Sequence, residues 1–331
     1  MSRIGRRQFL AAAGALITLP LAQAQPGARI HRIGCLAPRS RSTAANPEVF
    51  YDSFTQGMRE LGYVEGKNIA SEWRFADSKY ERLPALAAEL VQLNPELIVT
   101  HSTPATEALQ RATKTIPIVF GSATDPVASG FAASLARPGG NITGLSLINI
   151  DVSPKYLELL KLMVPGLSRA AVLVNPGSSY HPAILKGIQA AARLVGVNVL
   201  PVQARTPEEM DTGFAAMARE RADAIVVLSD AFFFGQRRHI TELAARSRLP
   251  AMYSFREFVE AGGLMSYGQN VADYYRHAAT YVDKILKGAK PGELPIEQPT
   301  KIHLAINRNT AKTLGIRVPE EMLLRADEVI G

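Results

Sequence analysis

Hydroxyl groups cluster in this sequence where an apolar, strand-like run gives way to a helical pattern. Ser102 and Thr103 follow Leu97–Val99, and Ala105 and Thr106 come next. The free backbone N–H groups and the positive dipole end at the start of a helix form a natural site for a carboxylate, to which hydroxyl groups also donate. The alternative is that Ser102 or Thr103 simply caps the helix.

Other strand-like runs also end in polar segments. Asp125, which precedes Pro126, either shapes a turn or contacts a ligand. Asp230 is the best candidate to pair with a ligand ammonium group, and an N-cap role fits the same place. For the segment 178–180, the alternative to ligand contact is a solvated loop that leads into a helix. The remaining predicted ligand contacts are Ser40, Ala123, Ser178, Ser179, Tyr180, Ser254 and Phe255.

The elements that would position these residues occur twice. The first half alternates strand-like and helical segments up to about residue 120, and the same series recurs from Ala171. The spacing from Gly62 to Pro117 is 55 residues, and the corresponding spacing from Gly196 to Pro250 is 54. Two similar α/β lobes in tandem place two sets of strand-end loops opposite each other, and open parallel sheets bind ligands at such loops. The repeat therefore predicts a two-lobed clamp around a small molecule.

The first 24 residues are typical of an export signal. Arginines without acids precede the apolar stretch Phe9–Leu21, and a small-x-small pattern predicts cleavage after Ala24. The pair Arg6-Arg7, followed by an aromatic residue and a leucine, matches the twin-arginine pattern. Gly5 stands where Ser or Thr is usual, so the general secretory route is an alternative. An ordinary amphipathic first helix is another.

Composition and charge limit the number of domains and the classes of partner that we expect for this chain. The 331 residues, 47% of them apolar and 20% charged, correspond to about two globular domains. Cleavage after Ala24 would remove three arginines and lower the net charge from +7 to +4, and this charge is spread along the chain, which leaves no nucleic-acid footprint. Cys35 is the only cysteine, so an intrachain disulfide is excluded, and we expect a buried thiol in the first strand. Arg32 before it does not fit a lipid-attachment motif. We expect a soluble periplasmic monomer without a membrane anchor or a nucleic-acid partner.

Several short motifs occur in one order along nearly all of the chain after the export signal: Thr103-Pro104-Ala105, Ile116–Phe120, Thr124–Val127, Pro138–Gly144, Leu173–Pro176, Ile306-Asn307 and Leu314–Pro319. Through these motifs the chain resembles the ABC transporter substrate-binding proteins of the tryptophan/tyrosine type, which have the type I periplasmic-binding-protein fold. The resemblance implies an α/β clamshell of two Rossmann-like lobes with parallel central sheets, joined by three crossover strands.

The same resemblance implies capture of a small carboxylate-bearing ligand, often an amino acid, for an inner-membrane ABC permease, with no cofactor. We place the first lobe at residues 25–145 plus about 271–297, and the second at about 146–270 plus about 298–331. The alternative function is a periplasmic ligand sensor that presents its closed form to a signalling receptor.

One departure from the family pattern concerns the ligand. Amino-acid-binding relatives commonly carry an aspartate soon after the strand equivalent to Ala251–Tyr253, whereas this chain has Ser254 and Phe255. The change replaces a charge with an aromatic wall, so an aromatic or aliphatic acid without an amino group becomes an alternative ligand. Phe232–Phe234 add ring surface nearby, and we expect that segment to pack mainly in the core.

Enzyme motifs are missing from the sequence. It contains no G-x-S-x-G, G-x-G-x-x-G, Walker A or H-E-x-x-H pattern, and its six histidines are scattered without metal-ligand spacing. His101 stands beside Ser102, but adjacent strand residues point to opposite faces, so the two side chains do not form a base–nucleophile pair. We therefore expect ligand binding without turnover. An unfamiliar α/β enzyme is the less favoured alternative.

Overall fold

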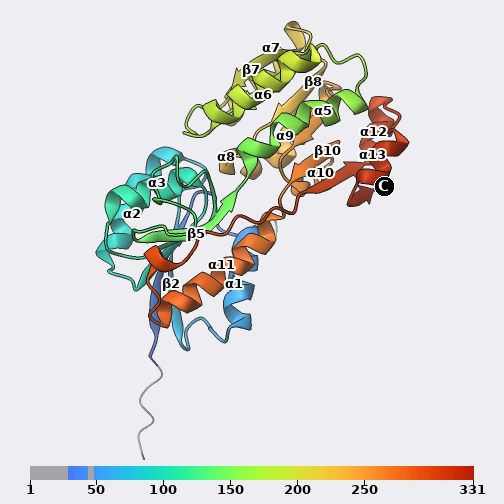
Figure 1. Cartoon of the computed structure of the whole chain (residues 1–331). Coiled ribbons are helices and arrows are strands. Elements are labelled where there is room, and N and C mark those ends of the chain that lie inside the picture. The colour runs from blue at the N-terminus through green and yellow to red at the C-terminus, as the bar shows by residue number, and fades with distance from the viewer. Residues whose placement is uncertain (1–28, 44–47) are drawn as a thin grey trace, which may run out of the picture.

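The computed structural model describes residues 29–43 and 48–331, and the predicted export signal lies outside these residues. Figure 1 shows two α/β lobes, each built on its own sheet, with the strand β5 between them. Among the described residues, no helix combines the length and apolar character needed to cross a bilayer.

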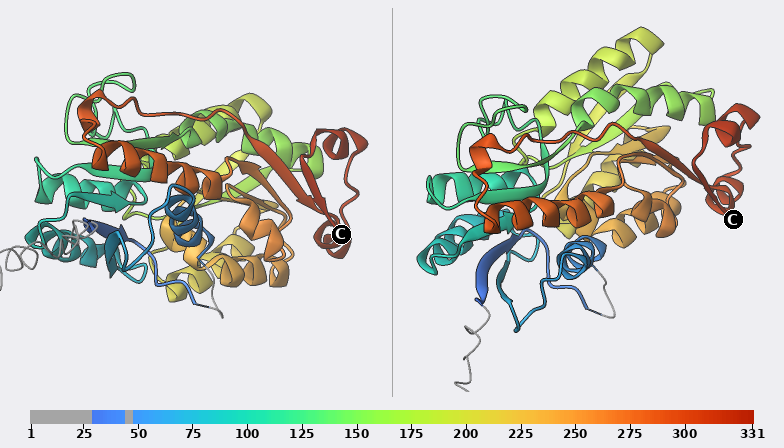
Figure 2. Two further views of the ribbon diagram at one scale, coloured as in Figure 1. Left: turned by 90° about the horizontal axis from the view of Figure 1, so that it is seen from below. Right: turned by 60° about the horizontal axis from the view of Figure 1, so that its bottom comes forward.

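The first lobe contains a parallel five-stranded sheet in the order β2-β1-β3-β4-β5. Helices α1 and α11 cover one face of this sheet, and α2 and α3 cover the other. Figure 2 shows α11, from late in the sequence, lying beside α1. The bounds are β1 His31–Ala37, α1 Val49–Glu60, β2 Ile69–Phe75, η1 Tyr80–Arg82, α2 Leu83–Gln92, β3 Leu97–Thr100, α3 Thr103–Ala112, β4 Ile118–Thr124, β5 Ile142–Leu147 and α11 Val271–Leu286.

The second lobe contains a seven-stranded sheet in the order β12-β11-β10-β9-β8-β6-β7. Its strands are parallel except at the antiparallel pair β10–β11. The bounds are α4 Asn149–Val152, α5 Pro154–Met163, β6 Arg169–Val174, α6 His181–Val195, β7 Asn198–Gln203, α7 Pro207–Arg219, β8 Ala224–Val227, α8 Ala231–Gly235, α9 Arg237–Arg246, β9 Ala251–Tyr253, α10 Arg256–Glu260, β10 Met265–Gly268, β11 His303–Asn307, α12 Arg308–Leu314, α13 Glu320–Arg325 and β12 Glu328–Ile330. The short helix η2 Pro291–Glu293 lies against β5 of the first lobe.

The sheet topology confirms the tandem repeat. The strand order β2-β1-β3-β4-β5 of the first lobe recurs as β7-β6-β8-β9-β10 in the second. The central strands carry apolar side chains on both faces, because helices cover both sides of each sheet. In β1, Ile33 and Cys35 pack under α1 and α11, whereas Leu36 packs under α2 and α3. Cys35 is accordingly a free, buried thiol, as predicted.

The chain passes between the lobes at three places, after β5, after β10 and before β11. Hydrogen bonds join these passages to one another. The backbone N–H of Ile148 donates to the Oε1 atom of Gln269 at 3.0 Å, and the N–H of Ser146 donates to the carbonyl of Glu297 at 2.8 Å. The three passages therefore form one connected hinge. The residue limits that we assign to the lobes stay a prediction.

Candidate ligand-binding site

The strand-end loops of the two lobes meet at a small cavity of about 30 Å³. Ligand pockets typically measure about 300–1,000 Å³, so a ligand can enter only if the lobes or their side chains move apart. The residues that line it from the first-lobe side are Arg39, Phe50, Ser102, Thr103, Ser122, Ala123, Thr124, Leu147, Val271 and Tyr275. Those from the second-lobe side are Tyr180, Ser229, Asp230, Ala231, Phe234 and Phe255.

Ser102 lies at the start of α3 in an unusual backbone conformation, with φ 74° and ψ 153°. This region is essentially reserved for glycine, and strain of this kind gathers at functional sites. The Oγ atom of Ser102 is buried, makes no cap hydrogen bond to α3, and has no other partner among the described residues. Simple side-chain capping by Ser102 is therefore not what the structure shows.

Thr103 has a structural bond in addition to its place in the cavity wall. Its Oγ1 atom accepts a hydrogen bond from the backbone N–H of Thr124 at 3.0 Å, which ties the end of β4 to the start of α3. A threonine hydroxyl also has one hydrogen to donate. Ala105 and Thr106 lie deeper and do not line the cavity, and the Oγ1 of Thr106 donates to the carbonyl of Ser102.

Asp230 caps α8. Its Oδ1 atom accepts hydrogen bonds from the backbone N–H groups of Phe232 and Phe233 at 2.9 and 3.2 Å, and from the Nδ2 of Asn175 at 3.1 Å. Its Oδ2 atom accepts from the hydroxyl of Tyr80 at 3.0 Å. A carboxylate offers about four lone-pair sites. The N-cap alternative for Asp230 is therefore present, and four donors within the protein bind its carboxylate, three at Oδ1 and one at Oδ2.

The other predicted contacts divide between the cavity wall and its surroundings. Tyr180, Ala123 and Phe255 line the cavity, and the hydroxyl of Tyr180 donates to the carbonyl of Ser229 at 2.8 Å. Asp125 shapes a turn, because its Oδ1 accepts from the backbone N–H of Ala128. The predicted residues outside the lining are Ser40, Ala105, Thr106, Asp125, Ser178, Ser179 and Ser254.

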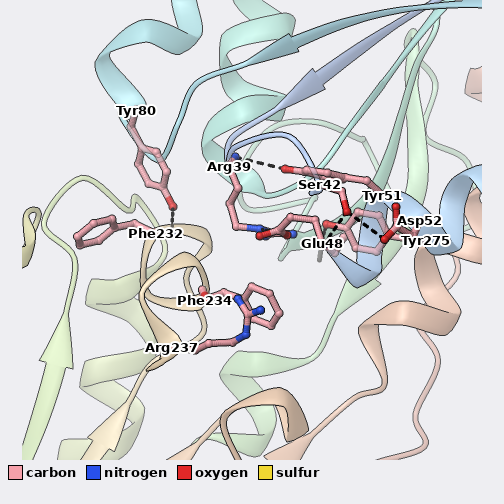
Figure 3. A network of polar contacts seen from close by, with 11 residues as sticks. Arg39, Ser42, Glu48, Tyr51, Asp52, Tyr80, Phe232, Phe234, Arg237 and Tyr275 are labelled. Carbon is pink, nitrogen blue, oxygen red and sulfur yellow. Dashed lines mark hydrogen bonds and ion pairs between the residues drawn. The ribbon is translucent and has the colours of Figure 1, made fainter. Parts of the chain in front are cut away.

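Arg39 is the principal lining residue that the sequence reasoning missed. Only 3% of it is exposed, and its Nε donates to the Oε2 of Glu48 at 2.8 Å (Figure 3). Its guanidinium carbon lies 4.8 Å from the ring centres of Phe50 and of Phe234. Burial lowers its pKa, but Tyr51 and Glu48 raise it more, so the pKa of Arg39 lies above its usual range and the group is a permanent cation.

Phe234 belongs both to the core and to the cavity wall. It packs in the core together with Phe232 and Phe233, as predicted, and it also lines the cavity. Its ring lies 4.6 Å from that of Phe50 and 5.7 Å from that of Phe255. Because Phe50 belongs to α1 and Phe234 to α8, aromatic rings from both lobes meet across the cavity.

His101 packs against Tyr275, one of the residues that line the cavity. Its ring stacks on Tyr51, at 4.7 Å between ring centres, and packs against Tyr275 at 4.3 Å. Neither ring nitrogen has a hydrogen-bond partner among the described residues. Burial, reinforced by the charge of Arg39, holds the pKa of His101 well below its usual range, so the ring is neutral.

Direct contacts between the lobes define a closed state. Besides donating to Asp230, the hydroxyl of Tyr80 accepts from the backbone N–H of Phe232 at 3.2 Å (Figure 3). At the exposed edge, the Oγ of Ser179 donates to the Oε1 of Glu107 at 2.6 Å. Burial and the charge of Asp230 raise the pKa of Tyr80 well above its usual range, which keeps its hydroxyl protonated.

A larger and more open groove of about 560 Å³ runs along α11 beside the hinge. Four of its ionisable side chains are paired with each other, because Arg276 binds Glu60 at 2.7 Å and His277 contacts Glu297 at 2.9 Å. The inter-lobe cavity combines buried, unpartnered donors with walls from both lobes, and it is the better candidate for a ligand site. Within the described part of the chain, no group of three or more His, Cys, Asp or Glu side chains is placed to hold a metal.

Two α/β lobes with a cavity between their strand ends define a type I periplasmic-binding-protein fold. A family model described as ABC transporter substrate binding protein matches residues 47–330, and the chain belongs to this family. A tyrosine-binding protein of Clostridioides difficile (strain R20291) is 26% identical over 265 residues, which cover 80% of this chain and 76% of that protein.

Two solved structures are similar over the whole fold. A conserved domain protein from Vibrio cholerae O1 biovar El Tor str. N16961 is 28% identical with a TM-score of 0.83, covering 90% of this chain and 99% of that one. An ABC domain from Streptococcus pneumonia, in complex with L-Trp, is 26% identical with a TM-score of 0.82, covering 91% and 99%. The matching family is one of substrate-binding proteins, and two of these relatives bind an amino acid, tyrosine in one case and L-Trp in the other.

Proposed function

We propose that this chain is the periplasmic substrate-binding component of an ABC uptake transporter. In this proposal the two lobes close on a small carboxylate-bearing ligand, either an amino acid or an aromatic or aliphatic acid, and deliver it to an inner-membrane permease. Export through the N-terminal segment, a monomeric state and the absence of a membrane anchor are parts of the same proposal.

The observation that carries this proposal is the start of α3, where the buried hydroxyl of Ser102 has no partner among the described residues and lines the inter-lobe cavity. A helix start offers free backbone N–H groups and a positive dipole end, which together favour a carboxylate. The tyrosine-binding and L-Trp-bound relatives support a ligand that carries a carboxylate.

A thermal-shift screen of the exported chain tests the proposal. A clamp that binds only when folded gains about 2.7 kcal/mol at a ligand concentration 100-fold above the dissociation constant. Amino acids, aromatic acids and short aliphatic acids form the panel, and sugar alcohols serve as the comparison class. We expect at least one carboxylate to raise the melting temperature and to be recovered unchanged. Conversion of the ligand into a product, or shifts with sugar alcohols alone, would contradict the proposal.

The variant Ser102→Gly separates the role of the hydroxyl from that of the fold. Glycine tolerates the positive φ of this position, so the variant should fold at least as stably as the parent. Its affinity for the ligand should nevertheless fall, because the hydroxyl donor is gone. Asn94→Gly is a matched control, since Asn94 also has a positive φ, 46°, but is exposed and does not line the cavity.

A further inference from the structure

The cavity contains an unused cationic donor. The Nε of Arg39 is occupied by Glu48, but the buried Nη2 has no hydrogen-bond partner among the residues that the structure describes. Buried donors in proteins normally have a hydrogen-bond partner, and a buried charged donor without one costs considerable free energy. Arg39 lines the cavity together with both rings that flank its guanidinium group, Phe50 and Phe234. An acceptor brought by a ligand would complete its bonding.

Arg39 and Ser102 lie at the ends of neighbouring strands. In the parallel pair β1–β3, Leu36 lies opposite Thr100. Arg39 comes three residues after Leu36 and Ser102 comes two residues after Thr100, so both residues stand at the same end of the sheet. Neighbouring strands are about 4.8 Å apart. Each oxygen of a carboxylate accepts hydrogen bonds from donors about 2.7–2.9 Å away, so one carboxylate bridges donors that stand on neighbouring strands. Because Arg39 and Ser102 line the same small cavity, a single carboxylate there can accept from Nη2 of Arg39 and from Oγ of Ser102. Arginine is well suited to this pairing because its guanidinium group is planar and always charged.

The cavity offers little negative charge to pair with an ammonium group. Asp230 carries the only carboxylate among the described residues that line it, and four donors within the protein already bind that carboxylate. An α-ammonium group would also lie close to the cation of Arg39, because it is attached next to the ligand carboxylate. Like charges at short distance in a desolvated site repel each other strongly.

We infer that the site selects an organic acid with an apolar body and no ammonium group, and that Nη2 of Arg39 and Oγ of Ser102 hold its carboxylate. Phe50, Phe234 and Phe255 enclose the apolar body when the lobes close on it. This inference rests on the proposed function and names its ligand class.

Isothermal titration with matched ligand pairs tests the inference. Each acid is compared with the amino acid that differs from it by an α-ammonium group: 3-phenylpropionate with phenylalanine, 3-(4-hydroxyphenyl)propionate with tyrosine, indole-3-propionate with tryptophan, and 4-methylpentanoate with leucine. The neutral 3-phenylpropanamide reports on the need for a charge. We expect at least one acid to bind tenfold or more tightly than its amino acid and than the amide.

The variant Arg39→Lys keeps the positive charge beside Glu48 but removes Nη2. Loss of a hydrogen bond to a charged group corresponds to about a 10- to 150-fold loss of affinity, so the acids should weaken by that factor and lose their advantage over the amide. Arg237→Lys is the matched control, because the guanidinium of Arg237 also lies 4.8 Å from the ring of Phe234 but does not line the cavity. We expect it to change acid affinity less than threefold.

If Arg39→Lys fails to fold, the double variant Arg39→Met with Glu48→Met removes both buried charges together and leaves neither unpaired. It must show the same selective loss of acid binding. Three results would overturn the inference and leave the proposed function standing. They are tighter binding of the amino acids than of the acids, binding of the amide as tight as that of the acid, and acid affinity that does not change in the Arg39 variants. Binding of none of the probes would overturn both.

Discussion

Removal of one hydroxyl group, by Tyr80→Phe, should weaken the closed state of the clamp. This hydroxyl is on η1 of the first lobe and donates to the Oδ2 of Asp230 in the second at 3.0 Å. It also accepts from the backbone N–H of Phe232, but that N–H keeps its bond to the Oδ1 of Asp230 at 2.9 Å. The substitution therefore leaves no buried donor unpaired and keeps the aromatic ring.

The size of the effect follows from the charge of the acceptor. A hydrogen bond to a charged group contributes about 1.5–3 kcal/mol, and only the closed state contains this one. If the ligand binds the closed state and the free protein is mostly open, the whole difference appears as affinity. Ligand binding should then weaken by about 10- to 150-fold.

The assay is isothermal titration of the best ligand from the thermal-shift screen, with small-angle X-ray scattering of the free and saturated protein. Ser179→Ala is the control, because it removes the bond to Glu107 at the exposed edge of the same cleft. We expect that control to change affinity less than about threefold, as is usual for exposed pairs. If Tyr80→Phe binds as tightly as the parent and closes to the same radius of gyration, the Tyr80–Asp230 bond does not hold the lobes together.

Three further predictions concern other parts of the chain. Burial keeps the pKa of His101 and of His181 below the usual range in the folded state. In the unfolded chain each histidine gains a proton below about pH 6.5, so the free energy of unfolding should decrease as the pH falls below that value. The free energy of unfolding should fall by up to about 1.4 kcal/mol per pH unit for each histidine. Urea unfolding at pH 7.5 and 5.5 should show a smaller loss in His101→Phe than in the parent, and an equal loss would contradict a neutral, buried His101. Cys35, which is buried and whose pKa burial raises above its usual range, should react with a thiol reagent only after denaturation, and rapid labelling of the native protein would refute its place in β1. Lysine in place of both Arg6 and Arg7 should retain the precursor in the cytoplasm, whereas an undiminished periplasmic yield would indicate the general secretory route.

The architecture was readable from the sequence because its signals are local. Continuous apolar runs mark strands buried on both faces, and the glycine and proline spacings mark the two copies of the series. Local signals also placed Cys35 in the first strand and put Thr103 and Tyr180 at strand ends that face the cavity.

The details of the site depend on long-range packing, which no local pattern encodes. In the loop after β1 the sequence favoured Ser40, whereas Arg39 lines the cavity, because Glu48 and rings from both lobes hold its buried guanidinium group. Phe234 packs in the core as predicted, but its additional place in the cavity wall depends on contact with Phe50 in the other lobe. For Asp230 the sequence left capping and ligand pairing open. The structure shows the cap and four donors on the carboxylate, two of which come from residues far from Asp230 in the sequence, so local sequence does not reveal them.

The central claim is that two lobes close on a small carboxylate, and a distance between the lobes tests it most directly. Nitroxide labels on cysteines that replace Arg111 in α3 and Lys186 in α6, both exposed, report on that distance, while the buried Cys35 stays unlabelled. The account predicts a broad distance distribution without ligand that narrows, at saturating carboxylate, to a single shorter distance. The same distribution with and without ligand would contradict it.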